Sequence, residues 1–169
     1  MKIKVISSFV IFFFFLSCDN PKKDDFSINI DLVIKQNDSI QLFYSDYKTL
    51  SFTEKKSFWT KVTGNKKNQT IKITFPDSVR PKQIRIDFGR NRLQPEIILN
   101  KIEFSFKENA AIYKGKEIFY IFREDQNNTV ADKLNGSIKR KNANQINGPS
   151  LYPKGEKLYN RLNQLYSQK

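Results

Sequence analysis

The sequence predicts an all-β protein, an antiparallel two-sheet sandwich (jelly-roll-like) with an amphipathic helix at its C-terminal end. Three observations predict this fold. Polar and apolar residues alternate with a period of two in successive segments between Phe26 and Phe106, as in half-buried strands. Proline, glycine and asparagine separate these segments. No helical pattern lies between them, as the crossovers of a parallel sheet would require, so we expect antiparallel pairing.

Six strands are predicted within residues 28–106. The first carries its apolar residues on one face: Ile28, Ile30, Leu32 and Ile34. The next four cover residues 40–44, 57–63, 70–75 and 83–88. The last covers residues 96–106 and has Ile102, Phe104 and Phe106 on one face. With residues 112–113 and 118–122 as a final strand or a short packed segment, the sandwich domain is expected to span residues 26–122.

The chain after residue 122 changes character twice. Residues 123–154 are polar and rich in asparagine, which predicts an extended or partly disordered loop. Residues 155–169 then place Leu158, Leu162 and Leu165 on one face of a helix. Because about three turns are too few for a stable isolated helix, we expect it to dock on the sandwich. The alternative is a helix that binds a partner.

The first 17 residues have the pattern of a secretory signal peptide. Lys2 and Lys4 precede a hydrophobic stretch that is shorter than the roughly 20 residues needed to span a bilayer. Phe15-Leu16-Ser17-Cys18 resembles the lipobox of bacterial lipoproteins, which implies a lipid on Cys18. Several acyl chains on that residue would anchor the protein stably to a membrane. The alternative is a free buried cysteine in an N-terminal anchor helix.

Residues 18–25 are expected to form a polar tether after the lipidated cysteine. Lys22-Lys23-Asp24-Asp25 resembles the export signal of surface-exposed lipoproteins in Bacteroidetes. That resemblance implies a protein at the outer membrane that faces outward. An inert tether is the alternative.

Composition excludes several kinds of chemistry. The chain has no histidine and one cysteine, which rules out a histidine general base, a zinc site of cysteine and histidine, and an intrachain disulfide. A glycosidase needs two carboxylates across the scissile bond. None of the six best placed acidic residues has a recognisable catalytic context: Asp31, Asp38, Asp46, Asp77, Asp87 and Glu96. We therefore expect no enzyme, no cofactor and no metal.

The chain is strongly basic, with 30 Lys and Arg against 17 Asp and Glu, a net charge of +13. Its basic clusters, Lys55-Lys56, Lys66-Lys67 and 139–141, are scattered over separate turns and form no single stripe. Lysine also outnumbers arginine. Arginine is the residue that makes paired hydrogen bonds to nucleic-acid bases, so its scarcity argues against base recognition. We therefore expect no nucleic-acid partner. Attraction to an anionic membrane surface is the weaker alternative.

The region from Ser39 to Phe106 resembles the carbohydrate-binding, galactose-binding-like β-sandwich modules. The resemblance rests on three strand-like stretches of the sequence: residues 69–76, 84–89 and 97–102. It implies a jelly-roll-like sandwich and contact with a glycan. It identifies no binding residue, because such modules place their sites on variable loops.

Six residues are candidates for contact with a ligand: Trp59, Tyr44, Tyr47, Arg85, Asp87 and Arg90. Trp59, the only tryptophan, could stack on the C–H face of a sugar or simply cover the rim of the core. The two tyrosines could line the same end of the sandwich or pack as ordinary half-buried residues. Arg85 and Asp87 point outward together and could hold a sugar group, or form a cross-strand pair on a solvated face. Arg90 belongs to a basic loop suited to carboxylate or phosphate, or to a solvated turn.

Two functions follow as hypotheses. The first is a non-catalytic, lipid-anchored glycan-binding module at the outer membrane. The second is a structural or accessory subunit of an envelope complex, which would use the C-terminal helix and the polar loop to bind a protein. A glycan binder should show an exposed aromatic ring beside polar groups in a groove, whereas a scaffold should show a large exposed apolar patch.

Overall fold

The computed structural model describes residues 25–76 and 78–167. One sheet contains β1 (Ser27–Ile34), β4 (Asn65–Thr74), β6 (Glu96–Phe106), β7 (Asn109–Lys114), β9 (Thr129–Asp132) and β10 (Ser137–Arg140). The other contains β2 (Asp38–Ser45), β3 (Ser57–Val62), β5 (Gln83–Phe88), β8 (Phe122–Glu124) and β11 (Ser150–Pro153). The helical segments are η1 (Glu54–Lys56), η2 (Gly115–Glu117), α1 (Ile118–Ile121) and α2 (Lys157–Ser167).

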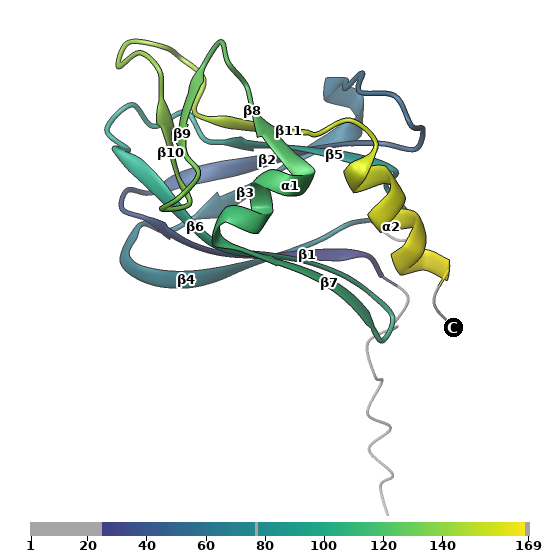
Figure 1. Cartoon of the computed structure of the whole chain (residues 1–169). Coiled ribbons are helices and arrows are strands. Elements are labelled where there is room, and N and C mark those ends of the chain that lie inside the picture. The colour runs from purple at the N-terminus through teal and green to yellow at the C-terminus, as the bar shows by residue number, and fades with distance from the viewer. Residues whose placement is uncertain (1–24, 77, 168–169) are drawn as a thin grey trace, which may run out of the picture.

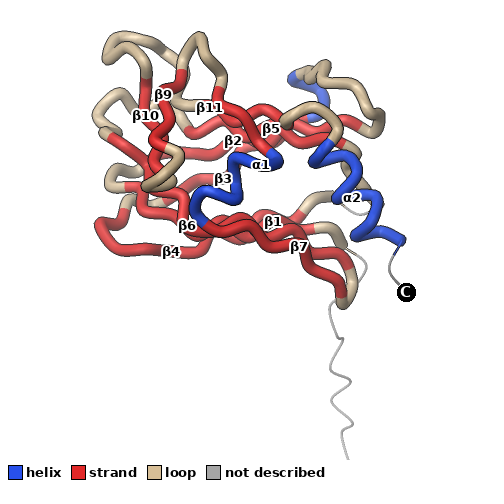
Figure 2. The backbone as a smooth tube through the Cα atoms, in the orientation of Figure 1, coloured by secondary structure: helices blue, strands red, loops and turns tan. Residues whose placement is uncertain are grey.

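The two sheets pack face to face as an antiparallel sandwich (Figure 1). The six-stranded sheet has the order β4-β1-β6-β10-β9, and β7 also pairs with β6. The five-stranded sheet has the order β3-β2-β5-β11-β8. Figure 2 shows the two strand layers with α1 and α2 beside them. The predicted all-β fold is therefore confirmed.

The core lies between the sheets and is built by the alternation seen in the sequence. In β1, the four residues of the predicted apolar face are all fully buried: Ile28, Ile30, Leu32 and Ile34. In β6, Ile102, Phe104 and Phe106 are buried in the same way. Since successive side chains of a strand point to opposite faces, one apolar residue in two is enough to fill the space between the sheets.

Helix α2 docks on the sandwich and contacts strands of both sheets, β5 on one side and β6 and β7 on the other. Its three leucines, Leu158, Leu162 and Leu165, are buried. The Tyr166 hydroxyl donates a hydrogen bond of 2.8 Å to the carbonyl of Pro81, and its ring packs edge-on against Phe26. The apolar face of α2 is thus used within the fold, as the docked-helix prediction requires. No helix in the described ranges is long and apolar enough to cross a membrane.

The prediction of a loop over residues 123–154 is wrong. This segment contains β9, β10, β11 and most of β8, so the sandwich continues to Pro153 rather than ending at residue 122. The strands have only three or four residues, and those of β10 and β11 bury Ile138 and Leu151 fully. Polar side chains support the turns between them, as where Gln145 Nε2 donates to the carbonyls of Asn128 and Asn147. The polar composition therefore reflects short strands and polar turns.

Residues 112–113 lie in strand β7, whereas residues 118–122 form the short helix α1 followed by the first residue of β8. Of the two predicted forms, the strand is therefore correct for residues 112–113 and the short packed segment for residues 118–121. Cys18, the signal peptide over residues 1–17 and most of the predicted tether lie outside the described residues. Lipidation therefore stays a prediction from the sequence.

Candidate functional site

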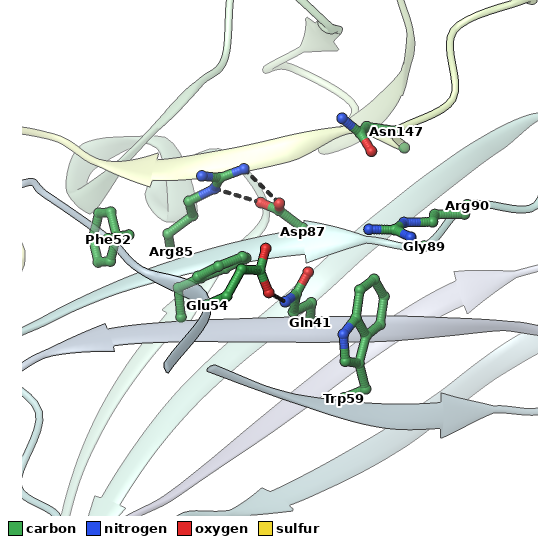
Figure 3. Close-up of a pocket in the computed structure, with 11 residues that line it drawn as sticks. Gln41, Phe52, Glu54, Trp59, Arg85, Asp87, Gly89, Arg90 and Asn147 are labelled. Atoms are coloured by element: carbon green, nitrogen blue, oxygen red, sulfur yellow. Dashed lines mark hydrogen bonds and ion pairs between the residues drawn. The ribbon is translucent and has the colours of Figure 1, made fainter. Parts of the chain in front are cut away.

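A pocket of about 200 Å³ lies on the outer face of the five-stranded sheet (Figure 3). Its floor follows from strand register. Trp59 of β3 is paired with Gln41 of β2, and Gln41 is paired with Asp87 of β5. Directly opposed residues in an antiparallel sheet point to the same face. The register therefore brings these three side chains into one row across three strands.

Three loops form the walls of the pocket. Phe52 and Glu54 come from the segment that leads into β3, and Arg90 comes from the turn after β5. Asn147 and Gly148 come from the segment that leads into β11. Figure 3 shows these side chains arranged around the floor residues. The loops belong to parts of the chain separated by tens of residues, so the pocket exists only in the folded protein.

Trp59 stands at this pocket with 44% of its surface exposed. The Arg90 guanidinium lies over the indole ring, 5.1 Å from its centre. Arg90 is itself exposed, so its side chain can move when another group stacks on the ring. An exposed indole beside polar groups has both an apolar face and nearby hydrogen-bonding partners.

Arg85 and Asp87 form a two-pronged ion pair in the pocket, with Nε to Oδ1 at 2.7 Å and Nη2 to Oδ2 at 2.6 Å. The guanidinium also lies between two rings, 4.7 Å from that of Phe43 and 4.5 Å from that of Tyr152. The pair joins neighbours on the same face of β5, and its side chains are only 21% and 16% exposed. The expectation of a solvated cross-strand pair is therefore wrong.

Gln41 connects the floor to one wall. Its side chain is almost fully buried, and its Nε2 donates to Glu54 Oε2 at 2.8 Å and to the Ser57 hydroxyl at 2.9 Å. The amide is held in one orientation by these two acceptors. The carboxylate of Glu54 is thereby fixed at the edge of the pocket.

The turn that carries Arg90 is anchored by Asp38 at the start of β2. The carboxylate of Asp38 accepts hydrogen bonds from the backbone N–H groups of Arg90 and Asn91. Gly89 adopts a positive φ of 66°, and a Cβ there would overlap this carboxylate. Gly148 donates to the carbonyl of Gly89 at 2.8 Å, and a Cβ at Gly148 would overlap the Phe88 carbonyl oxygen. Two glycines thus allow two loops to meet at the pocket.

Four of the six candidate residues meet in the pocket: Trp59, Arg85, Asp87 and Arg90. The two tyrosines do not line it. Tyr44 points to the other face of β2 and packs edge-on against Phe75, with ring centres 5.7 Å apart. Tyr47 is 71% exposed in the loop after β2, where Lys56 lies over its ring. Tyr44 is thus an ordinary packing residue.

Sequence reasoning missed five pocket side chains: Gln41, Phe43, Phe52, Glu54 and Asn147. Gln41 and Phe43 occupy the outward positions of a predicted strand, so the alternation in residues 40–44 already placed them on the outer face. The loop residues carried no comparable signal, because no local pattern tells which loops lie over which strands.

Burial raises the pKa of the Asp87 carboxyl above its ordinary value, and hydrogen bonding and charge from Arg85 oppose that shift. The net direction indicates that the pocket floor is poorly solvated. A hydrogen bond between a sugar hydroxyl and a carboxylate gains strength in such surroundings.

We expect the wild-type protein to gain stability relative to Asp87→Asn as the pH falls. The folded-state pKa of Asp87 lies above that of the unfolded chain, so the folded state binds more protons between the two values. This contribution is complete below the unfolded pKa and is lost as the pH rises through the folded pKa. Urea unfolding of both proteins at several pH values measures it. If the wild type instead loses stability relative to Asp87→Asn as the pH falls, the direction of the pKa shift would be contradicted.

Comparison with protein-family models, curated proteins and solved structures finds no match for this chain. In the part of the chain that the structure describes, no group of three or more His, Cys, Asp or Glu side chains is placed to hold a metal ion. The geometry of the pocket therefore provides the basis for inferring a function.

Proposed function

We propose that the pocket binds one sugar ring of a glycan and that the protein is a non-catalytic glycan-binding module. The observation that carries the proposal is the half-exposed Trp59 beside a floor of buried polar groups. Sugars present a flat face of C–H bonds that packs on an aromatic ring, while their hydroxyls need donors and acceptors at the edge. Gln41, Asp87 and Asn147 supply such groups next to the indole.

The size of the pocket fits this role. Pockets that enclose drug-sized ligands have volumes of about 300–1,000 Å³. A volume of about 200 Å³ suits a single ring, with the rest of a glycan outside the pocket. The close Arg85–Asp87 pair also argues for binding, because a carboxylate held in two hydrogen bonds by a guanidinium is poorly placed to transfer protons.

The alternative of an accessory subunit in an envelope complex has less support. The apolar face of α2 is buried against the sandwich. The large exposed apolar side chains in the described ranges come from separate segments, such as Leu50, Leu93, Ile112, Tyr120 and Leu134. Attachment to the outer membrane through a lipid on Cys18 is the second part of the proposal, and it rests on the lipobox-like sequence.

Affinity electrophoresis against a panel of neutral and acidic polysaccharides tests the proposal. We expect at least one polysaccharide to retard the protein, and Trp59→Ala to weaken that binding by about tenfold or more, which corresponds to about 1.4 kcal/mol. Tyr120→Ala is the matched control, since Tyr120 is an exposed aromatic residue on α1 outside the pocket. Its affinity should equal that of the wild type.

The salt dependence separates stacking from general charge attraction. At about 1 M salt the screening length is about 3 Å, so contacts due only to the net positive charge should disappear. Retardation of the wild type that persists in high salt and depends on Trp59 supports the proposal. Retardation that salt abolishes, or the same retardation in Trp59→Ala, would contradict it.

A further inference from the structure

A second hollow, a groove of about 520 Å³, is strongly basic and is formed in part by segments that also reach the pocket. Its charged lining consists of Arg92, Lys139, Arg140 and Lys141 against one carboxylate, that of Glu96. Four positive charges and one negative charge leave +3 on the lining. Gln94, Pro95 and Ala143 complete it.

Arg140 is the unusual member of this groove. It is only 9% exposed, and its Nη1 donates to the carbonyl of Asn91 at 2.7 Å. Its Nε and Nη2 are buried without a hydrogen-bond acceptor. A buried donor without an acceptor costs free energy, more so when it is charged. Burial lowers the pKa of Arg140, Asp38 opposes this, and the positive charge of Arg92 lowers the pKa further.

The nearby carboxylates are already engaged. The backbone of Glu96 is opposite that of Lys139 in the sheet, and its carboxylate lies 4.0 Å from Lys35 Nζ. The oxygens of Asp38 accept the backbone N–H groups of Ser39, Arg90 and Asn91. The groove therefore keeps a net positive charge that the described side chains do not neutralise. Guanidinium groups bind carboxylate, sulfate and phosphate oxygens in paired hydrogen bonds.

Two segments of the chain contribute residues to both the groove and the pocket, although no residue lines both. The segment of residues 89–96 lines the pocket through Gly89 and Arg90 and the groove through Arg92 and Glu96. The segment of residues 139–148 lines the groove through Lys139 and the pocket through Gly148. A linear polymer with one ring in the pocket could therefore continue into the groove.

We propose that the groove binds an oxyanion, a sulfate, phosphate or carboxylate group, on the same glycan chain that occupies the pocket. The glycan is then an acidic polysaccharide, and Arg92, Lys139 and Arg140 select it over a neutral one. This inference rests on the proposed function, because the pocket supplies the first contact. An anionic lipid surface would be attracted by the same charges and is an outcome that the test separates.

The first experiment probes the groove without any glycan. Sodium sulfate is titrated into the ¹⁵N-labelled protein at constant ionic strength against sodium chloride, and the Nε–H signal of Arg140 is followed. We expect a saturable shift for sulfate, and several-fold weaker binding in Arg92→Ala/Lys139→Ala. Lys66→Ala/Lys67→Ala removes the same charge from β4, at the opposite edge of the six-stranded sheet, and should leave binding unchanged. A shift that never saturates, or that both double variants change equally, would overturn the proposal.

The second experiment compares each polysaccharide that binds in the electrophoresis panel with its sulfated derivative. Sulfation should tighten binding by about tenfold, and Arg92→Ala/Lys139→Ala should remove that gain. Equal affinity for the neutral and sulfated forms, with Trp59 still required, would refute the groove and leave the proposed function intact. If the wild-type protein binds none of the polysaccharides, neutral or sulfated, in a way that depends on Trp59, both the proposed function and this inference are refuted. Binding to phosphatidylglycerol vesicles through the groove, without a preference for sulfated glycan, would also overturn it.

Discussion

Replacing Phe104 with alanine is expected to lower the free energy of unfolding by about 3–5 kcal/mol. Phe104 is fully buried in β6 at the centre of the core. Its ring centre lies 6.3 Å from those of Phe26, Tyr113 and Phe122, which belong to different parts of the chain. Alanine would leave a cavity lined by these rings, and β6 is paired on both sides, so the strand cannot move in to fill it.

Urea unfolding followed by circular dichroism measures this loss. Ile112→Ala is the control, because Ile112 is about half exposed on β7 and points away from the core. The control should change stability by less than about 1 kcal/mol. If Phe104→Ala also changed the free energy of unfolding by less than about 1 kcal/mol, Phe104 could not be tightly packed in the core as described.

Replacing Arg85 with alanine is expected to cost about 2–4 kcal/mol of folding stability. The change leaves Asp87 in its poorly solvated position without the guanidinium that holds both its oxygens. Loss of one partner of a buried pair leaves an uncompensated charge, which is costly. It also removes the packing of Arg85 between Phe43 and Tyr152. Because both side chains keep some exposure to water, the effect should be below that for a fully dry pair.

A double-mutant cycle separates the charge from the packing. If the unpaired carboxylate causes the loss, Arg85→Ala/Asp87→Ala should be more stable than Arg85→Ala alone. The Arg85→Ala protein should also have a higher Asp87 pKa than the wild type, since the guanidinium opposes the effect of burial. Additive effects of the two substitutions would contradict a coupled pair in the pocket.

The long strands could be predicted from sequence because each repeats its pattern several times. Eight residues of β1 contain four buried apolar positions. In β6 the alternation appears twice, over residues 96–99 and 102–106, with a shift of one residue between them where the pairing with β1 is irregular. The short strands β9, β10 and β11 could not be predicted in this way. Each has four residues, so each face of the strand carries only two positions, and two positions are too few to show a period. Their pairing with longer strands, not their own sequence, makes them strands.

Some residues of the pocket could likewise be predicted from the sequence, and others could not. Trp59, Arg85 and Asp87 were found because alternation places them outward on strands. The proximity of Trp59 to Asp87 depends on the order β3-β2-β5, which local sequence does not determine. The position of the loops over the sheet decides which loop side chains line the pocket, here Phe52, Glu54 and Asn147. The buried state of Arg140 also follows from tertiary packing, because a charged residue at the end of a short polar strand looks like a surface residue.

Tryptophan fluorescence tests the central claim most directly, since Trp59 is the only tryptophan in the chain and lies in the pocket. The emission spectrum of the protein is recorded while a polysaccharide that retards it in electrophoresis is added. We predict a saturable change in intensity and wavelength with the same affinity as the retardation, because a stacked sugar removes water from the indole. Unchanged emission at saturating polysaccharide would show that the glycan binds elsewhere and would contradict the assignment of this pocket as the binding site.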